Sequence, residues 1–465
     1  MSGPMFLPKD RAAKIHRASL QVLEQTGIRL DHEEAEALLL RAGARKDRSG
    51  RVLIPGTLVE KALAEAPRQV QLYDRDGRPS ILLEVGRTRF GPGSDAQYNI
   101  DRQTGELRPS TLQDVADNVR LADALPGFDF IMSMSLPSDV APAKLYPTVF
   151  AEMAKNSTKP IVTTLDDLRQ IHGVASIIAG GEEVLRHRPF FVAYLEPISP
   201  LRIERSIAER ILYCGQHGIP MLFAAGANCG GGAPVTPEGG VVQGSAESLA
   251  GLVLVRLKGP EARFVHGANT SAVDMRSSCV CYGAPEWFKT TAMFADMGHH
   301  YCLPSWGTAG SSDAHRPDAQ AALEAYEGIL LALQSQSTLV HDVGYLAYGT
   351  LYDARMLVLT DLTIRRGRHL LRPADLSKEA LAVEIIDEVA RENLLYMAHE
   401  HTARHFRKCL WLPPAWINRR TLGNFASEKQ LEELLSDEVR RILAQHQPSP
   451  LEAGKLRQIE AFLSG

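Results

Sequence analysis

Residues 220–267 decide the fold, because two strand-like runs flank a helix-like run there. "PMLFAA" (220–225) is short and apolar, and "SAESLAGLVLVRL" (245–257) is long enough for a helix. A second short apolar run, "RFVHG" (263–267), follows the helix-like run. Strands that alternate with helices are typical of a parallel sheet built from β–α units. The stretch therefore predicts an α/β fold.

The same alternation extends on both sides of this stretch. Helical patterns such as "STLQDVADNVRLADAL" (110–125) and "DAQAALEAYEGILLAL" (318–333) separate further strand-like runs. The eight predicted strands are Thr88–Gly91, Phe128–Ser135, Pro160–Leu165, Phe190–Glu196, Pro220–Ala225, Arg263–Gly267, Tyr301–Trp306 and Thr338–Val343. Eight strands with intervening helices predict a TIM-type (β/α)8 barrel. An open doubly wound sheet is the alternative, but open parallel sheets more often stop at about five to seven strands.

Helical sequences without this alternation flank the barrel. Near the N-terminus, "DHEEAEALLLRAG" (31–43) begins with the spacing of a capping box. We therefore predict three parts: an N-terminal helical segment (1–84), the (β/α)8 barrel (85–370) and a C-terminal helical extension (371–465). A barrel with such extensions often self-associates, so we expect a homo-oligomer.

Composition excludes several classes of protein. The formal net charge of −4 gives no basic footprint for nucleic acid. No apolar run approaches the ~20 residues that span a bilayer, and the N-terminus has no apolar signal core. Six cysteines without regular pairing fit a reducing compartment. These features predict a cytoplasmic protein with no nucleic-acid or membrane partner.

The motifs of three common kinds of site are absent from the sequence. "GHHYC" (298–302) and "CVC" (279–281) hold metal-type side chains, but there is no HExxH and no paired CxxC, so we predict no metal site. The glycine-rich residues 226–240 lack the phosphate-binding pattern GxxxxGK[ST], and a mobile loop is the better interpretation. No GxSxG elbow marks a nucleophilic serine. A metal-dependent hydrolase on the same fold stays open as an alternative.

Aromatic and polar side chains gather at the carboxyl ends of the predicted strands, where barrel enzymes build their sites. The aromatic residues are Phe90, Tyr98, Tyr194, Trp306 and Tyr345. Their faces could hold a quaternary ammonium, whose charge cannot be satisfied by hydrogen bonds, although any single ring could instead cap the barrel core. The polar candidates are Glu196, His266, Arg316 and His341. Arg316 can bind a carboxylate through two parallel hydrogen bonds, and a cation beside a carboxylate describes a betaine.

Many ordered stretches resemble the trimethylamine methyltransferase family over nearly the whole chain. They include "FGPGSDAQYNID", "PISPL", "GIPMLFAAG", "DMRSSCVCYGAPE", "LPSWGTAGSSDAHRPDAQAALE", "LVHDVGYLAYG", "LAVEIIDEV" and "HEHTARHFR". The resemblance implies a TIM barrel that moves a methyl group from a methylated amine to reduced cobalamin. A separate corrinoid protein carries that cobalamin, so no tightly bound cofactor is expected.

The founding trimethylamine enzymes carry pyrrolysine in a G-S-x-S-D-A motif, and the matching position here is Ser311, in "AGSSDAH" (309–315). The chain thus resembles members without pyrrolysine, several of which are similar to glycine betaine methyltransferases. A quaternary ammonium leaves as a neutral amine and needs no electrophilic helper. Glycine betaine is therefore the first candidate substrate, with carnitine, proline betaine or a non-catalytic betaine-binding barrel as alternatives.

The resemblance also suggests roles in the loop at 305–321. Trp306 is a candidate wall of an aromatic cage, and His315 stands where the pyrrolysine members have lysine. Asp313 is expected to cap the following helix or to orient Arg316. His341, at the end of the eighth strand, is expected to face the same cavity.

Overall fold

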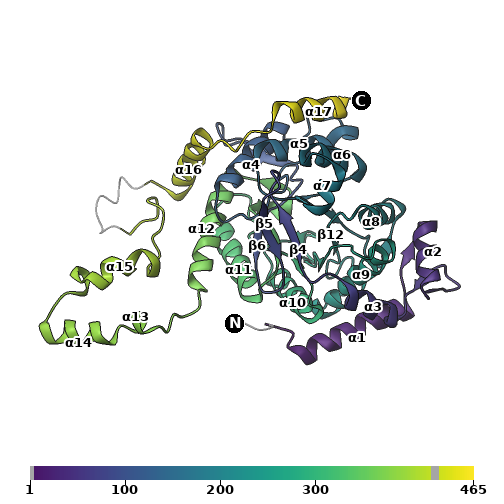
Figure 1. The fold of residues 1–465 in the computed structure, drawn as a ribbon, viewed down its shortest axis with the longest axis horizontal. Helices are drawn as coiled ribbons and strands as arrows, with labels where there is room; N and C mark the ends of the chain where they lie inside the picture. The colour runs from purple at the N-terminus through teal and green to yellow at the C-terminus, as the bar shows by residue number, and fades with distance from the viewer. Residues whose placement is uncertain (1–4, 420–428, 465) are drawn as a thin grey trace.

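The computed structural model describes residues 5–419 and 429–464, and its centre is a barrel of parallel strands surrounded by helices (Figure 1). Seven strands are hydrogen-bonded in the order β6-β17-β16-β13-β12-β10-β9. Their bounds are β6 Arg89–Pro92, β9 Ile161–Thr163, β10 Phe191–Leu195, β12 Met221–Ala225, β13 Phe264–Ala268, β16 Ser305–Thr308 and β17 Leu339–Val343. The predicted α/β barrel is confirmed.

Residues 128–135 take the eighth position and close the barrel between β6 and β9. The Met134 N–H donates to the carbonyl of Gly93 at 3.0 Å, and the Ile131 N–H donates to that of Pro160 at 2.9 Å. This segment forms isolated parallel bridges and no regular strand. Met134 adopts a φ of 61°, in the left-handed region, which interrupts an extended backbone.

The strand predicted at Tyr301–Trp306 begins later in the sequence than expected. Tyr301 is the last residue of helix α10 (Pro285–Tyr301), and the strand begins only at Ser305. Cys302 ends the helix with a left-handed φ of 54°. The apolar residues continue from helix to strand, and periodicity alone cannot separate the two elements.

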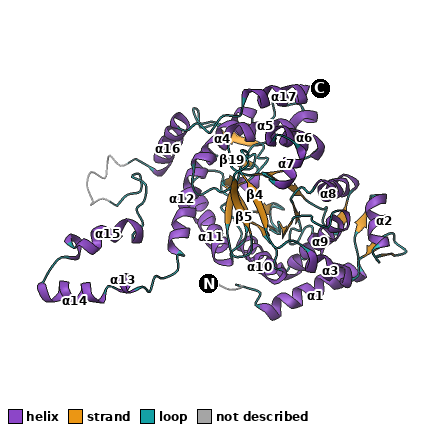
Figure 2. Ribbon diagram, viewed as in Figure 1, coloured by secondary structure: helices purple, strands orange, loops and turns teal. Residues whose placement is uncertain are grey.

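Helices cover the outside of the barrel, as Figure 2 shows. They are α4 Leu112–Ala124, α5 Leu145–Asn156, α6 Leu168–Ala179, α7 Glu182–His187, α8 Arg205–His217, α9 Pro237–Lys258, α10, α11 Ala319–Ser335 and α12 Ala354–Leu370. The central helix α9 is buried almost all round, because α1, α3, α8 and α10 pack against it. No helix in the described ranges is long and apolar enough to cross a membrane.

The first 84 residues place three helices on the outside of the barrel and a hairpin at its amino end. Helices α1 (Lys9–Gln25), α2 (Glu33–Arg41) and α3 (Gly56–Glu65) pack against α9. An antiparallel hairpin, β4 (Val70–Tyr73) and β5 (Pro79–Leu83), was not predicted. Its apolar side chains join those at the starts of the barrel strands in one buried cluster, which includes Leu72, Val192 and Leu222. Only the carboxyl end is left for a site.

The remaining described strands form three short pairs and one small sheet outside the barrel. The pairs are β1 (Arg29–Leu30) with β11 (Arg202–Ile203), β2 (Arg45–Lys46) with β3 (Val52–Leu53), and β14 (Ala272–Val273) with β15 (Val280–Cys281). The small sheet, at the carboxyl end of the barrel, has the order β18-β19-β7-β8 (Tyr345–Leu346, Leu351–Tyr352, Tyr98–Ile100 and Leu107–Pro109).

The C-terminal part divides into two pieces. Helices α13 (Lys378–Leu381), α14 (Val383–Glu392) and α15 (Glu400–Cys409) project away from the barrel (Figures 1 and 2). Helices α16 (Leu431–Gln445) and α17 (Ala453–Ser464) lie against it, α16 on α4 and α12 and α17 on α5 and α6. His446 also reaches the carboxylate of Asp123 at 2.7 Å.

Candidate active site at the carboxyl end of the barrel

Aromatic side chains from three strands meet at the carboxyl end of the barrel. Trp306 of β16 and His341 of β17 stack with ring centroids 4.0 Å apart and 27° between their planes. Tyr194 of β10 lies 5.4 Å from the Trp306 ring and 6.0 Å from the His341 ring. These three predicted site residues therefore form one cluster.

Asn269, directly after β13, links the cluster through hydrogen bonds. Its amide nitrogen donates to the Tyr194 hydroxyl and, at 2.9 Å, to Glu196 Oε1. Its amide oxygen accepts from Trp306 Nε1 at 3.2 Å and lies 3.3 Å from His341 Nε2. The Tyr194 hydroxyl itself donates to Glu196. One amide thus fixes the orientation of four side chains.

The electrostatics of this cluster favour a positively charged ligand. Burial raises the pKa of Glu196, while hydrogen bonds from Tyr194 and Asn269 act in the opposite direction. Burial and the neighbouring Glu196 raise the pKa of Tyr194 well above its usual value, so this hydroxyl stays protonated. His341 Nδ1 lies 2.8 Å from Asp342 Oδ1. The described contacts of the cluster involve two carboxylates and no lysine or arginine.

A second acidic group lies at the end of β6. The Asp95 N–H donates to Ser133 Oγ at 3.1 Å, and that hydroxyl donates back to the Asp95 carboxylate at 3.1 Å. Burial raises the pKa of Asp95. Burial, and after it the Asp342 and Asp95 carboxylates, raise the pKa of Tyr345 well above its usual value. The Tyr345 ring packs on the backbone of Gly93, where a Cβ would lie 2.3 Å from it. Tyr345 therefore belongs to the same end of the barrel.

The loop after β16 is held by its own polar side chains. Ser311 is buried and donates to the carbonyl of Tyr282 at 3.1 Å. The Asp313 carboxylate accepts from the N–H groups of Tyr282 and Gly283 at 2.7 and 3.0 Å. Asp313 therefore anchors a neighbouring loop, and the prediction that it caps the next helix is wrong. Asp318 caps α11 instead, accepting from Ala321 at 3.0 Å.

Two predicted site residues point away from the interior of the barrel. Phe90 points outward to α12, where the Arg368 guanidinium lies 5.5 Å from its ring. His266 also points outward, with its ring 5.0 Å from that of Tyr301 on α10. Successive side chains of a strand alternate between the two faces of the sheet. The predictions that Phe90 and His266 line the site are therefore wrong, because each side chain lies on the outer face of its strand.

Three further predicted residues join no contact of the cluster. Tyr98, in β7, is 41% exposed at the barrel rim. His315 and Arg316 are exposed in the loop after β16. Their roles in substrate binding stay predictions.

Sequence reasoning missed Asn269, Asp95, Asp342 and Tyr282, whose ring lies 6.3 Å from that of Tyr345. Asn269 and Asp342 carried a usable signal, since each lies at or within two residues of the end of a predicted strand. Asp95 and Tyr282 lie deeper in loops, whose course the sequence pattern does not give.

One other group offers metal-type ligand atoms. Those of His172, Glu182 and His217 lie within 4.8 Å of one another. His172 Nδ1 is 3.0 Å from the Tyr213 hydroxyl, and His217 Nδ1 is 2.6 Å from Glu182. These contacts occupy the Nδ1 atom of each histidine.

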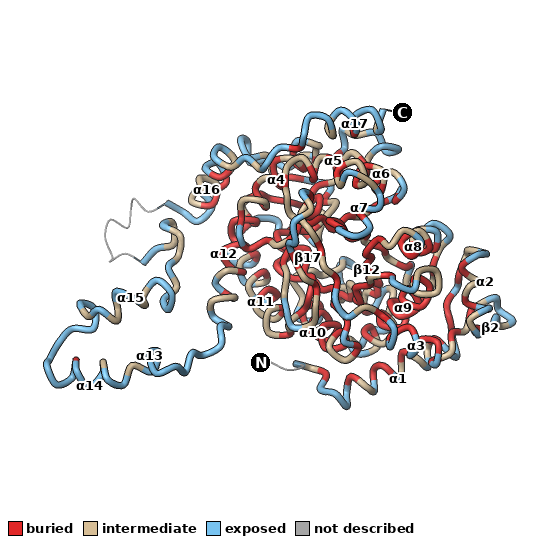
Figure 3. Tube along the Cα trace, viewed as in Figure 1, coloured by how far each residue is buried: buried red, intermediate tan, exposed pale blue. Residues whose placement is uncertain are grey.

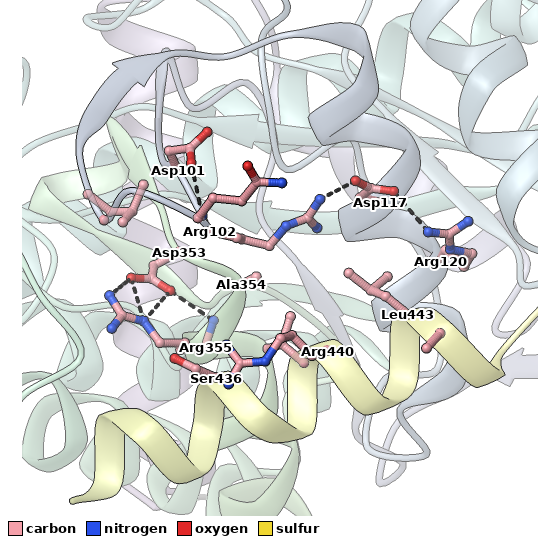
Figure 4. Close-up of a pocket in the computed structure, with 15 residues that line it drawn as sticks. Asp101, Arg102, Asp117, Arg120, Asp353, Ala354, Arg355, Ser436, Arg440 and Leu443 are labelled. Carbon is pink, nitrogen blue, oxygen red and sulfur yellow. Dashed lines mark hydrogen bonds and ion pairs between the residues drawn. The ribbon is translucent and has the colours of Figure 1, made fainter.

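A separate cavity of about 440 Å³ lies between α16, α4, the start of α12 and residues 100–105 (Figure 4). Asp117 pairs with Arg102 and, at 3.0 Å, with Arg120. Asp353 pairs with Arg355 at 2.5 Å. Because its charged groups are paired, this cavity is best explained as the seam that holds α16 on the barrel.

Comparison with known proteins places this chain among amine methyltransferases. The model of the trimethylamine methyltransferase family matches residues 4–464. Trimethylamine methyltransferase MttB of Desulfitobacterium hafniense is 30% identical over 447 residues, 94% of this chain and 89% of that protein. The glycine betaine methyltransferase of that species is 24% identical over 465 residues, 99% of this chain and 96% of that protein.

A solved structure supports the fold. The monomethylamine methyltransferase of Methanosarcina barkeri aligns with a TM-score of 0.53 and 13% identity, over 95% of this chain and 88% of that one. The family match covers both the barrel and its helical additions, and together with the 30% identical relative it shows that the chain belongs to the trimethylamine methyltransferase family and is a methyltransferase.

Proposed function

We propose that this enzyme transfers a methyl group from a small quaternary amine to the reduced cobalamin of a separate corrinoid protein. The observation that carries the proposal is the cluster of Tyr194, Trp306 and His341 rings beside the Glu196 carboxylate. Aromatic faces attract a quaternary ammonium that no hydrogen bond can reach. A carboxylate in the same cluster adds the opposite charge.

The chain's own residues have positioning roles in this reaction. The rings hold the ammonium, and Asn269 keeps them and Glu196 in place. The C–N bond breaks with its electron pair on nitrogen, while reduced cobalt supplies the pair for the new bond to carbon. Since the amine leaves neutral, no proton has to move and no residue is assigned as a general acid or base. The contribution of the protein is alignment and exclusion of water.

Glycine betaine is the first substrate to assay. A relative bears that name, and Ser311 occupies the pyrrolysine position of the trimethylamine enzymes. A betaine would place its carboxylate toward solvent, because Glu196 repels it. Arg316 is exposed in the loop after β16, on this side of the barrel, and is the proposed partner of that carboxylate.

The test is single-turnover methyl transfer to free cob(I)alamin with glycine betaine, choline, carnitine, proline betaine and trimethylamine as donors. We expect a quaternary amine to react and trimethylamine not to react. Trp306→Leu should abolish transfer, whereas Trp411→Leu, in the C-terminal part, should not. Transfer from trimethylamine alone would overturn the substrate class. Tight betaine binding without any transfer, also with candidate corrinoid proteins, would identify a binding protein instead.

A further inference from the structure

Residues 370–412, the arm, leave the barrel and expose many apolar side chains. Figure 3 colours most of the arm as exposed, unlike the barrel. The large apolar side chains that are at least half exposed here are Leu370, Leu376, Leu381, Val383, Ile386, Leu395, Tyr396, Met397, Leu410 and Leu412. Within the described residues of the arm, Val389 is the one apolar side chain classed as buried.

The arm is nevertheless an ordered unit. The Arg372 guanidinium donates to the carbonyl of Lys408 at 3.2 Å, which ties the outgoing chain to the returning chain. His405 lies 3.0 Å from Glu379, joining α15 to α13. Both α14 and α15 have ten residues; α14 exposes Val383 and Ile386, whereas α15 is mostly polar and its one large apolar side chain, Phe406, is half-buried. Helices this short are marginal in water unless their apolar face is packed.

The end of the arm is its most apolar part. Leu394, Leu395, Tyr396 and Met397 follow one another between α14 and α15, and Met397 is 91% exposed. Monomeric proteins rarely expose more than a few hundred Å² of contiguous apolar surface. Ten such side chains expose on the order of 1,000 Å², comparable with the ~800 Å² that each partner buries in a standard interface.

We propose that a second copy of this chain covers the arm, with α14 of each copy packed against α15 of the other. The charges of the two helices support this occupant. Helix α14 has four acidic residues and one arginine, a net charge of −3. Helix α15 has one glutamate against two arginines and one lysine, a net charge of +2 with neutral histidines. A two-fold arrangement repeats this complementary contact twice.

Charge reversal with mixing tests the proposal. Glu388→Lys with Glu392→Lys reverses α14, and Arg407→Glu with Lys408→Glu reverses α15. In either variant alone, both contacts between copies become repulsive, and the dissociation constant of the oligomer should rise at least tenfold. In a mixture of the two variants, α14 of one meets α15 of the other with opposite charge. Mixing should therefore restore association, which no effect on folding within one chain can produce.

Sedimentation velocity at micromolar concentration measures these states, and circular dichroism checks that each variant is folded. Wild type should sediment as a dimer or as a larger oligomer built from dimers. Met397→Asp should dissociate it, whereas Leu323→Asp, on an exposed site of α11, should not. A monomeric wild type would overturn the proposal. So would two variants that stay apart when mixed, or an oligomer that Met397→Asp leaves intact.

Discussion

Replacing Glu196 by glutamine tests the electrostatic part of the site. The Tyr194 hydroxyl contacts this carboxylate and the Tyr194 ring lies 5.4 Å from Trp306, so a cation held against the rings lies about 5 Å from the charge. At an effective dielectric constant of about 20, one charge pair at that distance contributes about 3 kcal/mol. Glu196→Gln should therefore weaken the binding of tetramethylammonium by roughly a hundredfold at pH 8.

The pH dependence of the same binding gives a second readout. Burial raises the pKa of Glu196 above the usual 4.5, and only the charged carboxylate attracts the ligand. A quaternary ammonium does not titrate, so wild-type affinity should fall as pH is lowered toward that raised pKa, while Glu196→Gln should show a flat profile. Isothermal titration between pH 5 and 8 measures both, with Glu327→Gln as the exposed control. Equal dissociation constants for wild type and Glu196→Gln at pH 8 would refute the reasoning.

Three further predictions concern other parts of the molecule. Arg316→Ala should weaken the binding of glycine betaine about fivefold and leave the binding of choline unchanged, as measured by calorimetry, because an exposed ion pair contributes about 1 kcal/mol. Equal losses of affinity for both ligands would exclude the carboxylate contact. Burial lowers the pKa of His266 from 6.5 to about 3, so the unfolded chain binds a proton below pH 6.5 that the folded chain does not. The contribution of His266 to the free energy of unfolding is thus complete above pH 6.5 and about 2 kcal/mol lower at pH 5. In urea titrations, His266→Phe should lose less unfolding free energy between these pH values than wild type, and the exposed His187→Phe should behave as wild type. Leu72→Ala should lower the free energy of unfolding by about 2–5 kcal/mol, because this side chain is fully buried between hairpin and barrel. The exposed Leu107→Ala is the control, with an expected cost below about 0.5 kcal/mol. A cost as small for Leu72→Ala would show that the hairpin is dispensable.

The barrel was readable from the sequence, but the direction of its side chains was only partly so. Short apolar runs gave the strands, and polar or aromatic residues at their ends gave Tyr194, Glu196, Trp306 and His341. A strand buried on both faces has no alternation of polarity, so nothing in it says which residue points inward. That ambiguity explains why Phe90 and His266 were misplaced.

Features that depend on contacts distant in sequence were not readable. The sequence places Asn269 near a strand end, but its contacts with the ends of three other strands arise only in the fold. The β4–β5 hairpin likewise meets the barrel only after the chain has closed. The exposed arm gave no signal either, since its amphipathic helices look like those that cover a barrel.

The β4–β5 hairpin has a kinetic consequence, if methyl transfer occurs as proposed. With the amino end of the barrel sealed, methyl donor and methyl acceptor must use the same entrance. The small amine then has to enter before a corrinoid protein covers the mouth, and the demethylated product can leave only after that protein departs. Steady-state kinetics should accordingly follow a compulsory order, with excess corrinoid protein inhibiting by trapping enzyme that holds no amine.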